Sequence, residues 1–159
     1  MFSLIIIVIS IALGAAMALA TLYFGGDAFN EGSAKATAAT LVNQAQQING
    51  ANTLHFLDEQ VYGDMAALTA AGKYLQAAPN PGQVAAESDL DGVVTVAKYD
   101  VATADGKISL DIKSEAVCKA VNQQSGLGGV LAADEAGLAD VQFGCYGAAG
   151  AESFTFVFK

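Results

Sequence analysis

The stretch that decides the fold is Phe2–Phe24, FSLIIIVISIALGAAMALATLYF, which contains no charged side chain. An α-helix rises about 1.5 Å per residue, so this run spans roughly 35 Å, enough to cross a bilayer core. Isoleucine and valine dominate its first half, whereas small residues fill its second half and include Gly14, Ala15 and Ala18. Because small residues let helices approach closely, we expect this helix to pack against other helices.

The position of this helix at the start of the chain allows three interpretations. A cleaved secretory signal needs a basic leader and a short apolar core, and neither is present. An uncleaved signal anchor normally carries Lys or Arg before the span, whereas the first cation here is Lys35. The third interpretation, a mature amino terminus at Met1 that opens directly with the hydrophobic helix, fits best.

Helical periodicity resumes after Gly25 and Gly26, each of which weakens a helix by about 1 kcal/mol relative to Ala. Small or apolar residues then recur at every third or fourth position, and only the last is polar. These residues are Ala34, Ala38, Leu41, Ala45, Ile48 and Asn52. The pattern predicts one helix, interrupted or bent near Gly25, from residue 2 to the mid-fifties.

The rest of the chain predicts a compact α+β head over residues 58–159. Met65–Leu75 is expected to form a short helix or turn, which the following prolines end. The polar stretch Gly82–Gly92 is expected to be a loop. Ser114 is placed to cap a helix that runs through Asn122.

Strand signals dominate the second half of the head. Val93–Tyr99 and Lys107–Ile112 flank Asp105–Gly106, which predicts a β-hairpin. Two further strands are expected over Val141–Tyr146 and Ser153–Phe158. In the last strand the aromatic residues alternate with other side chains and predict a buried face. They are Phe154, Phe156 and Phe158.

Charge argues against one class of function, and the absence of motifs bears on others. Hydrophobic residues make up 53% of the chain, charged residues 14%, and the formal net charge is −9. This acidic balance argues against binding of nucleic acid, which needs clustered cations. No nucleophile motif surrounds any Ser, and we expect neither enzymatic activity nor a cofactor. His55 has no second His or Cys nearby, and Asp89 and Asp91 form only a fragment of a calcium loop, for which Ca²⁺ binding stays open.

Three local features resemble type IV pilins. The start MFSLIIIVISIALG is similar to processed pilin amino termini, with Met1 and Gly14 suiting the type IVb branch. The stretch from Met65 to Pro79 resembles the L…GYL…P sequence that follows the long pilin helix. Ser114–Val121 is similar to the cysteine-bearing helix of type IVb pilins.

The resemblance implies a long N-terminal hydrophobic α-helix packed on an antiparallel β-sheet head domain. Residues 1–26 would then be the transmembrane and filament-core helix and residues 27–57 its amphipathic continuation. Met1 would be the processed, methylated amino terminus. The residues assigned to packing in the filament core are Phe2, Ile5, Ile6, Gly14, Ala15, Ala18 and Phe24.

The resemblance also places the chain outside the cytoplasm. Cys118 and Cys145 are the only cysteines, so a disulfide between them is the default there, worth about 3–4 kcal/mol on the loop-entropy model. The implied function is a major pilus subunit that polymerises with itself. Its implied partners are the prepilin peptidase, the pilus assembly machinery and, before assembly, the inner membrane. The alternatives are a minor pilin, a type II secretion pseudopilin, or a monomeric membrane-anchored binding module of the cell envelope.

One departure concerns the fifth position, where the family has a glutamate and this chain has Ile5. In the family that carboxylate is thought to pair with the amino terminus of a neighbouring subunit. An ammonium left unpaired in an apolar core is costly, and the first carboxylate here is Asp27. Three alternatives would compensate for the missing carboxylate: hydrogen bonds to the hydroxyls of Ser3 and Ser10, methylation of the amino terminus, or its deprotonation.

Overall fold

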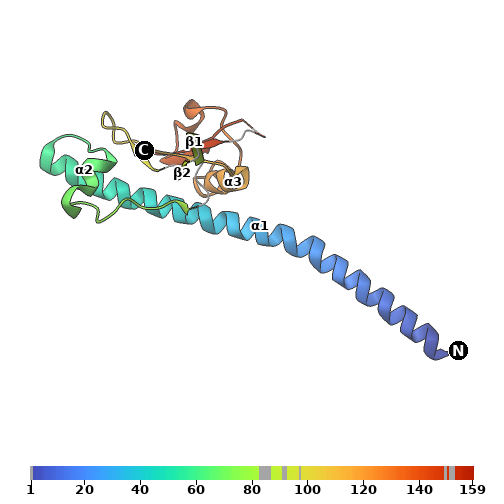
Figure 1. Cartoon of the computed structure of the whole chain (residues 1–159). Helices are drawn as coiled ribbons and strands as arrows, with labels where there is room; N and C mark the ends of the chain where they lie inside the picture. The colour runs from blue at the N-terminus through green and yellow to red at the C-terminus, as the bar shows by residue number, and fades with distance from the viewer. Residues whose placement is uncertain (1, 83–86, 91–92, 97, 149, 151–152) are drawn as a thin grey trace. The chain divides into compact units, whose positions relative to one another are not determined.

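The computed structural model describes the backbone of residues 2–82, 87–90, 93–96, 98–148, 150 and 153–159. Side chains are described over the same ranges, apart from residues 2, 4, 22–28, 87–90 and 93–96. The chain divides into two compact units, Met1–Ala34 and Lys35–Lys159. Figure 1 locates the helices and strands along the chain. The fold class is α+β, as expected, with a long N-terminal helix and an antiparallel sheet.

Helix α1 extends over Phe2–Glu59 and contributes to both units. The prediction of one helix is confirmed, and α1 continues through Gly25 and Gly26 without an interruption. It ends where Gln60 adopts a left-handed conformation (φ 59°) and its N–H donates to the carbonyl of Phe56 at 2.9 Å. Such a residue reverses the chain and satisfies one of the last helix carbonyls.

The second half of α1 buries the side chains that its periodicity singled out. Ala38, Leu41, Ala45 and Ile48 are completely buried, and Asn52 is nearly so. Because these positions lie three or four residues apart, they form a single face of the helix. This face supplies one wall of the core in the Lys35–Lys159 unit.

A short helical segment follows α1. Helix α2 (Met65–Thr69) begins at Asp64, whose carboxylate accepts a hydrogen bond from the N–H of Ala67 at 2.7 Å. The 3₁₀ turn η1 (Ala70–Gly72) ends it, with Ala71 and Gly72 both left-handed. The helical segment expected over residues 65–75 therefore stops before the prolines, because two left-handed residues have already turned the chain.

The main sheet has four antiparallel strands in the order β3-β4-β6-β5. Its strands are β3 (Asp100–Val101), β4 (Ile108–Ile112), β5 (Phe143–Tyr146) and β6 (Phe154–Phe158). In the central pair, the register sets Leu110 opposite Phe156. Phe154, Phe156 and Phe158 are buried, which confirms the predicted aromatic face.

The hairpin around Asp105–Gly106 is confirmed, but its first strand is β3 rather than the predicted Val93–Tyr99. Strand β2 (Val93–Val96) instead pairs with β1 (Glu87–Leu90) in a separate two-stranded sheet. The prediction of a loop over Gly82–Gly92 is therefore wrong for residues 87–90. Strand β1 has the sequence ESDL and gives little strand signal, because its pairing uses backbone groups that every residue carries.

Helix α3 (Glu115–Gln124) and the 3₁₀ helix η3 (Glu135–Leu138) complete the head. The Ser114 hydroxyl accepts from the N–H of Val117 at 3.4 Å, which confirms the predicted cap. Helix α3 packs on β5. Leu138 of η3 lies over Gly144, where an added Cβ would come within 2.6 Å of Leu138 Cδ2. Gly144 pairs with Val157, so η3 covers this part of the sheet and Val157 is buried as well.

Candidate functional site

The N-terminal part of α1 carries an aliphatic surface that is exposed wherever its side chains are described. We call residues Ile5–Leu19 the exposed aliphatic segment. Its large side chains are all more than half exposed: Ile5, Ile6, Ile7, Val8, Ile9, Ile11, Leu13, Met17 and Leu19. Burying one such side chain completely gains about 1.5–3 kcal/mol. A surface of this kind is a candidate for association, because a contiguous apolar patch in water marks an interaction site.

The hydroxyl groups in and beside this segment already have partners within the helix. Ser10 Oγ donates to the carbonyl of Ile6 at 2.8 Å. Thr21 Oγ1 lies 2.9 Å from the carbonyl oxygen of Met17 and 3.0 Å from that of Ala18. Because these donors are satisfied locally, they do not oppose the removal of water from the segment.

Small residues interrupt the aliphatic surface at the positions expected to admit a neighbouring helix. Ala15 and Ala18 are exposed, and a Cβ added to Gly14 would meet no atom within 4 Å. The structure thus places Ile5, Ile6, Gly14, Ala15 and Ala18 on open surface of one helix. Packing between subunits at these residues stays a prediction. Met1, Phe2 and Phe24, assigned the same role or that of the processed terminus, lie outside the residues whose side chains are described.

A membrane-spanning helix was expected over residues 2–24. Within the part of the chain that the structure describes, no helix combines the length and the apolar character needed to cross a membrane. The expected span also includes Phe2, Leu4 and residues 22–24, whose side chains are not described.

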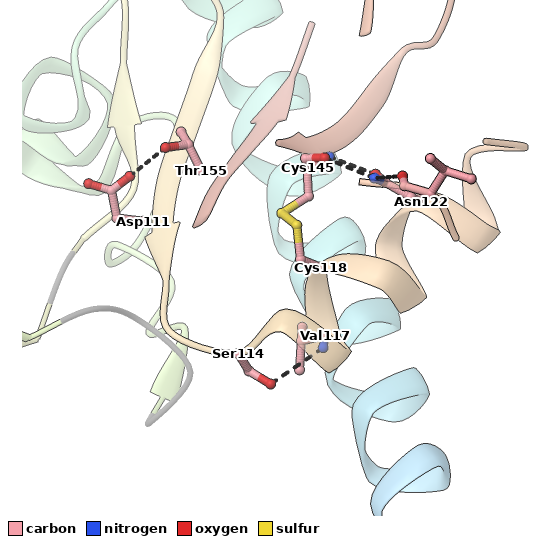
Figure 2. The surroundings of a disulfide bond; sticks show 8 residues. Asp111, Ser114, Val117, Cys118, Asn122, Cys145 and Thr155 are labelled. Atoms are coloured by element: carbon pink, nitrogen blue, oxygen red, sulfur yellow. Dashed lines mark hydrogen bonds between the residues drawn. A yellow bond between two sulfur atoms is a disulfide. The ribbon is translucent and has the colours of Figure 1, made fainter. Parts of the chain in front are cut away.

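The expected disulfide is present in the head. Cys118 of α3 and Cys145 of β5 are joined, with their Cα atoms 5.3 Å apart (Figure 2). Both residues are completely buried. Because the sulfur atoms are bonded to each other and shielded from solvent, neither serves as a nucleophile or a metal ligand. The bond attaches the helix that covers the sheet to an edge strand.

Sequence reasoning missed Asn122, a completely buried polar residue in the same cluster. Its Oδ1 accepts from the N–H of Cys145 at 2.8 Å, and its Nδ2 donates to the carbonyl of Cys145 at 2.8 Å. The same Nδ2 donates to the carbonyl of Val130 at 2.6 Å. The side-chain amide therefore pairs with strand β5 as a neighbouring strand would, and satisfies its edge at this point. The signal in the sequence was a polar residue one helical turn after Cys118, on the apolar side of α3.

A second buried amide ties the end of α1 to the β3–β4 hairpin. Asn52 Oδ1 accepts from the N–H of Gly63 at 2.9 Å, and its Nδ2 lies 3.5 Å from the carbonyl oxygen of Gly106. Gly106 adopts φ 72°, and an added Cβ would come within 2.8 Å of the Tyr62 ring. The predicted Asp-Gly turn thus fits closely against Tyr62, which follows α1, and against Asn52 of α1, which explains why glycine is needed there.

The middle of α1 is fastened to the head through Gln44. The Tyr99 hydroxyl donates to Gln44 Oε1 at 2.8 Å, while Gln44 Nε2 donates to the carbonyl of Asn80 at 3.0 Å. Burial raises the pKa of Tyr99 well above its ordinary value of 10.0, because the anion would lose its hydration. The Tyr99 hydroxyl therefore serves as a structural hydrogen-bond donor to α1.

His55 and its neighbours form a surface cluster at the end of α1. The His55 ring meets Tyr74 edge to face at 5.1 Å, and its Nδ1 lies 2.8 Å from the carbonyl oxygen of Val61. Tyr74 donates to Asp58 Oδ2 at 2.9 Å, and Lys73 Nζ lies 3.3 Å from the same oxygen. The Tyr74 hydrogen bond, followed by Lys73, lowers the pKa of Asp58. These contacts hold the chain after α2 against the helix.

The described residues contain no cluster of three or more His, Cys, Asp or Glu side chains able to hold a metal ion. Asp91 and the side chain of Asp89, considered for Ca²⁺, lie outside the described residues. Among the side chains that the structure describes, the exposed aliphatic segment brings together nine large apolar groups that are more than half exposed.

Comparison with protein-family models, with curated proteins and with solved structures finds no match to this chain. The resemblance to type IV pilins thus rests on the local sequence features described above.

Proposed function

We propose that this chain is a structural subunit, and the major one, of a type IV pilus-like filament on the bacterial surface. The observation that carries the proposal is the exposed aliphatic segment, whose described large side chains are all more than half exposed. In a filament this segment packs against the same segment of neighbouring copies. The disulfide-bonded head domains then form the outer surface of the fibre.

The energetics favour several neighbours for each helix over a single one. If one neighbour covers half of each of the nine large side chains in Ile5–Leu19, the gain is about 9 kcal/mol at about 1 kcal/mol each. Association of two molecules costs on the order of 4–15 kcal/mol in lost freedom. One contact therefore only balances its cost, whereas a helical array surrounds each segment and adds further contacts. Repeated heterologous contacts of this kind produce an open fibre rather than a closed ring.

The proposal includes partners and a route. The prepilin peptidase processes the amino terminus, and the subunit then resides in the inner membrane. The pilus assembly machinery inserts it from there into the fibre. The fibre serves adhesion, aggregation, motility or DNA transfer, while the subunit itself needs no cofactor and catalyses no reaction. The membrane stage rests on the sequence of residues 2–24 alone, and fractionation of cells that lack the assembly machinery tests it separately.

Electron microscopy of material sheared from producing cells, with mass spectrometry of the subunit's amino terminus, tests the proposal. Thin filaments built from this chain with Met1 as the processed terminus are the expected result. They would show a fibre assembling with Ile5 in place of the usual glutamate. Filaments that contain this chain at trace level would assign it to a minor subunit or pseudopilin. Absence of filaments together with a retained basic leader would indicate an envelope-anchored module.

A substitution in the aliphatic segment tests the contact itself. Ala18→Leu adds bulk at an exposed position of α1 and should block assembly, because neighbouring helices can no longer approach closely. Ala66→Leu makes the same change at an exposed position of α2 and should assemble normally. Circular dichroism and an intact disulfide verify folding of both variants. Normal fibres from Ala18→Leu would mean that this residue is not part of the contact.

A further inference from the structure

We infer that Asn122 is a positioning residue for disulfide formation, because it holds Cys145 against helix α3 independently of the sulfur atoms. Cys118 and Asn122 lie one helical turn apart on the same face of α3. Both reach Cys145, one through its sulfur and the other through the backbone (Figure 2). The amide contact therefore sets the alignment that the disulfide also requires.

The orientation of the Asn122 amide is determined by its partners. Its oxygen faces one N–H group, while its nitrogen faces the two carbonyl groups of Val130 and Cys145. A flipped amide would place its NH₂ group against the Cys145 N–H and its oxygen against two acceptors. The N–H of Leu127 also donates to the backbone carbonyl of Asn122 at 2.9 Å, so the loop after α3 folds back over this residue. All of these contacts use groups that are present before oxidation.

Both cysteines are completely buried in the folded head, so an oxidant reaches them only while the contact between α3 and β5 is open. In the first step one thiolate attacks a small-molecule disulfide, forms a mixed disulfide and expels one thiolate. When the contact closes, the second cysteine thiolate attacks the cysteine sulfur of the mixed disulfide and expels the second thiolate. The two protons lost by the cysteine thiols are taken up, through solvent, by the two expelled thiolates, so the two electrons reduce the small-molecule disulfide to two thiols. Asn122 acts in the second step, where it raises the effective concentration of the resolving thiol.

The test measures the thiol–disulfide equilibrium of the full chain in detergent, in buffers of reduced and oxidised glutathione. The oxidised fraction is read by alkylation and mass spectrometry, and urea unfolding of each reduced protein is followed in parallel. Asn122→Leu should lower the effective concentration of the cysteine pair at least tenfold. The matched control is Asn52→Leu, which removes a buried amide that bonds to neither cysteine. It should lower the urea midpoint while leaving the effective concentration within about twofold.

Two results would overturn the inference. One is a glutathione equilibrium for Asn122→Leu within twofold of the wild type, and the other is an equal fall in Asn52→Leu, which would show general destabilisation. If reduced Asn122→Leu does not fold, hydrogen exchange in the full-length Cys118→Ala variant decides the question. The Cys145 amide should stay protected to within about tenfold of the disulfide-bonded protein, since Asn122 still accepts from it. Exchange at the rate of an exposed amide would contradict the positioning role.

Discussion

Gly106 lies in the predicted hairpin turn and packs closely against Tyr62 and Asn52. Gly106→Ala is a direct test of this contact. The residue adopts φ 72°, and an added Cβ would lie 2.8 and 2.9 Å from two carbons of the Tyr62 ring and 3.1 Å from Asn52 Nδ2. The Tyr62 ring stacks on Phe56 with centroids 4.7 Å apart. The ring therefore cannot withdraw without losing that contact.

Two separate costs make up the expected effect. A left-handed conformation costs an L-residue roughly 1–2 kcal/mol relative to glycine. Displacing Tyr62 adds the loss of a ring pair, about 0.5–1.5 kcal/mol, and the strain of an overpacked contact, about 1 kcal/mol or more. Gly106→Ala should therefore lower the free energy of unfolding by about 2.5–4.5 kcal/mol.

Gly128→Ala is the matched control, because Gly128 is also left-handed (φ 67°) but a Cβ there would meet no atom within 4 Å. It should lose only the backbone part, about 1–2 kcal/mol. Urea unfolding of the full chain in detergent, followed by circular dichroism, measures both. Equal losses in the two variants would refute the claim that the hairpin turn packs against Tyr62. A second check is Gly106→Ala combined with Tyr62→Ala, whose effects should be less than additive.

Two further predictions concern the head. Leu138→Ala should lower the free energy of unfolding by about 2–5 kcal/mol, because Leu138 is buried over Gly144 and its truncation leaves a cavity. The control Val130→Ala, at an exposed position, should change the free energy of unfolding by less than about 0.5 kcal/mol. Similar losses in the two variants would contradict the assignment of Leu138 to the core. The pKa of Asp58 is held below its ordinary value of 3.8, so its stabilising contribution is complete above that value and is lost as pH falls through the lowered pKa. Urea unfolding midpoints measured between about pH 6 and pH 2.5 should fall less steeply in Asp58→Asn than in the wild type. An equal fall in the two proteins would show that the Asp58–Tyr74 contact does not cause the loss of stability at low pH.

Elements that follow from local periodicity were predictable from the sequence. The face of α1 from Ala38 to Asn52 and the alternation of aromatic residues in β6 are buried as expected. The Ser114 cap and the hairpin turn at Gly106 are also present. In each case the signal lies within a few residues, because helix and strand periods determine which side chains share a face.

Elements that depend on distant partners were not predictable in this way. Strand β1 has a polar sequence and exists through its backbone pairing with β2, so the loop expected there was wrong. Strand β2 carries the apolar run assigned to the hairpin, yet β4 pairs with β3 instead. Strand pairing is decided by which backbone groups meet, and side-chain alternation alone does not identify the partner.

The sequence by itself determined that the chain begins with a long apolar helix, continues as an amphipathic one and ends in a head with two cysteines. These properties are local, since hydrophobicity, periodicity and turn chemistry act between near neighbours. Only the tertiary structure decided what Asn122, Asn52 and Gln44 do. A polar side chain can be buried only where its hydrogen-bonding groups meet partners, and these partners come from segments far apart in the chain.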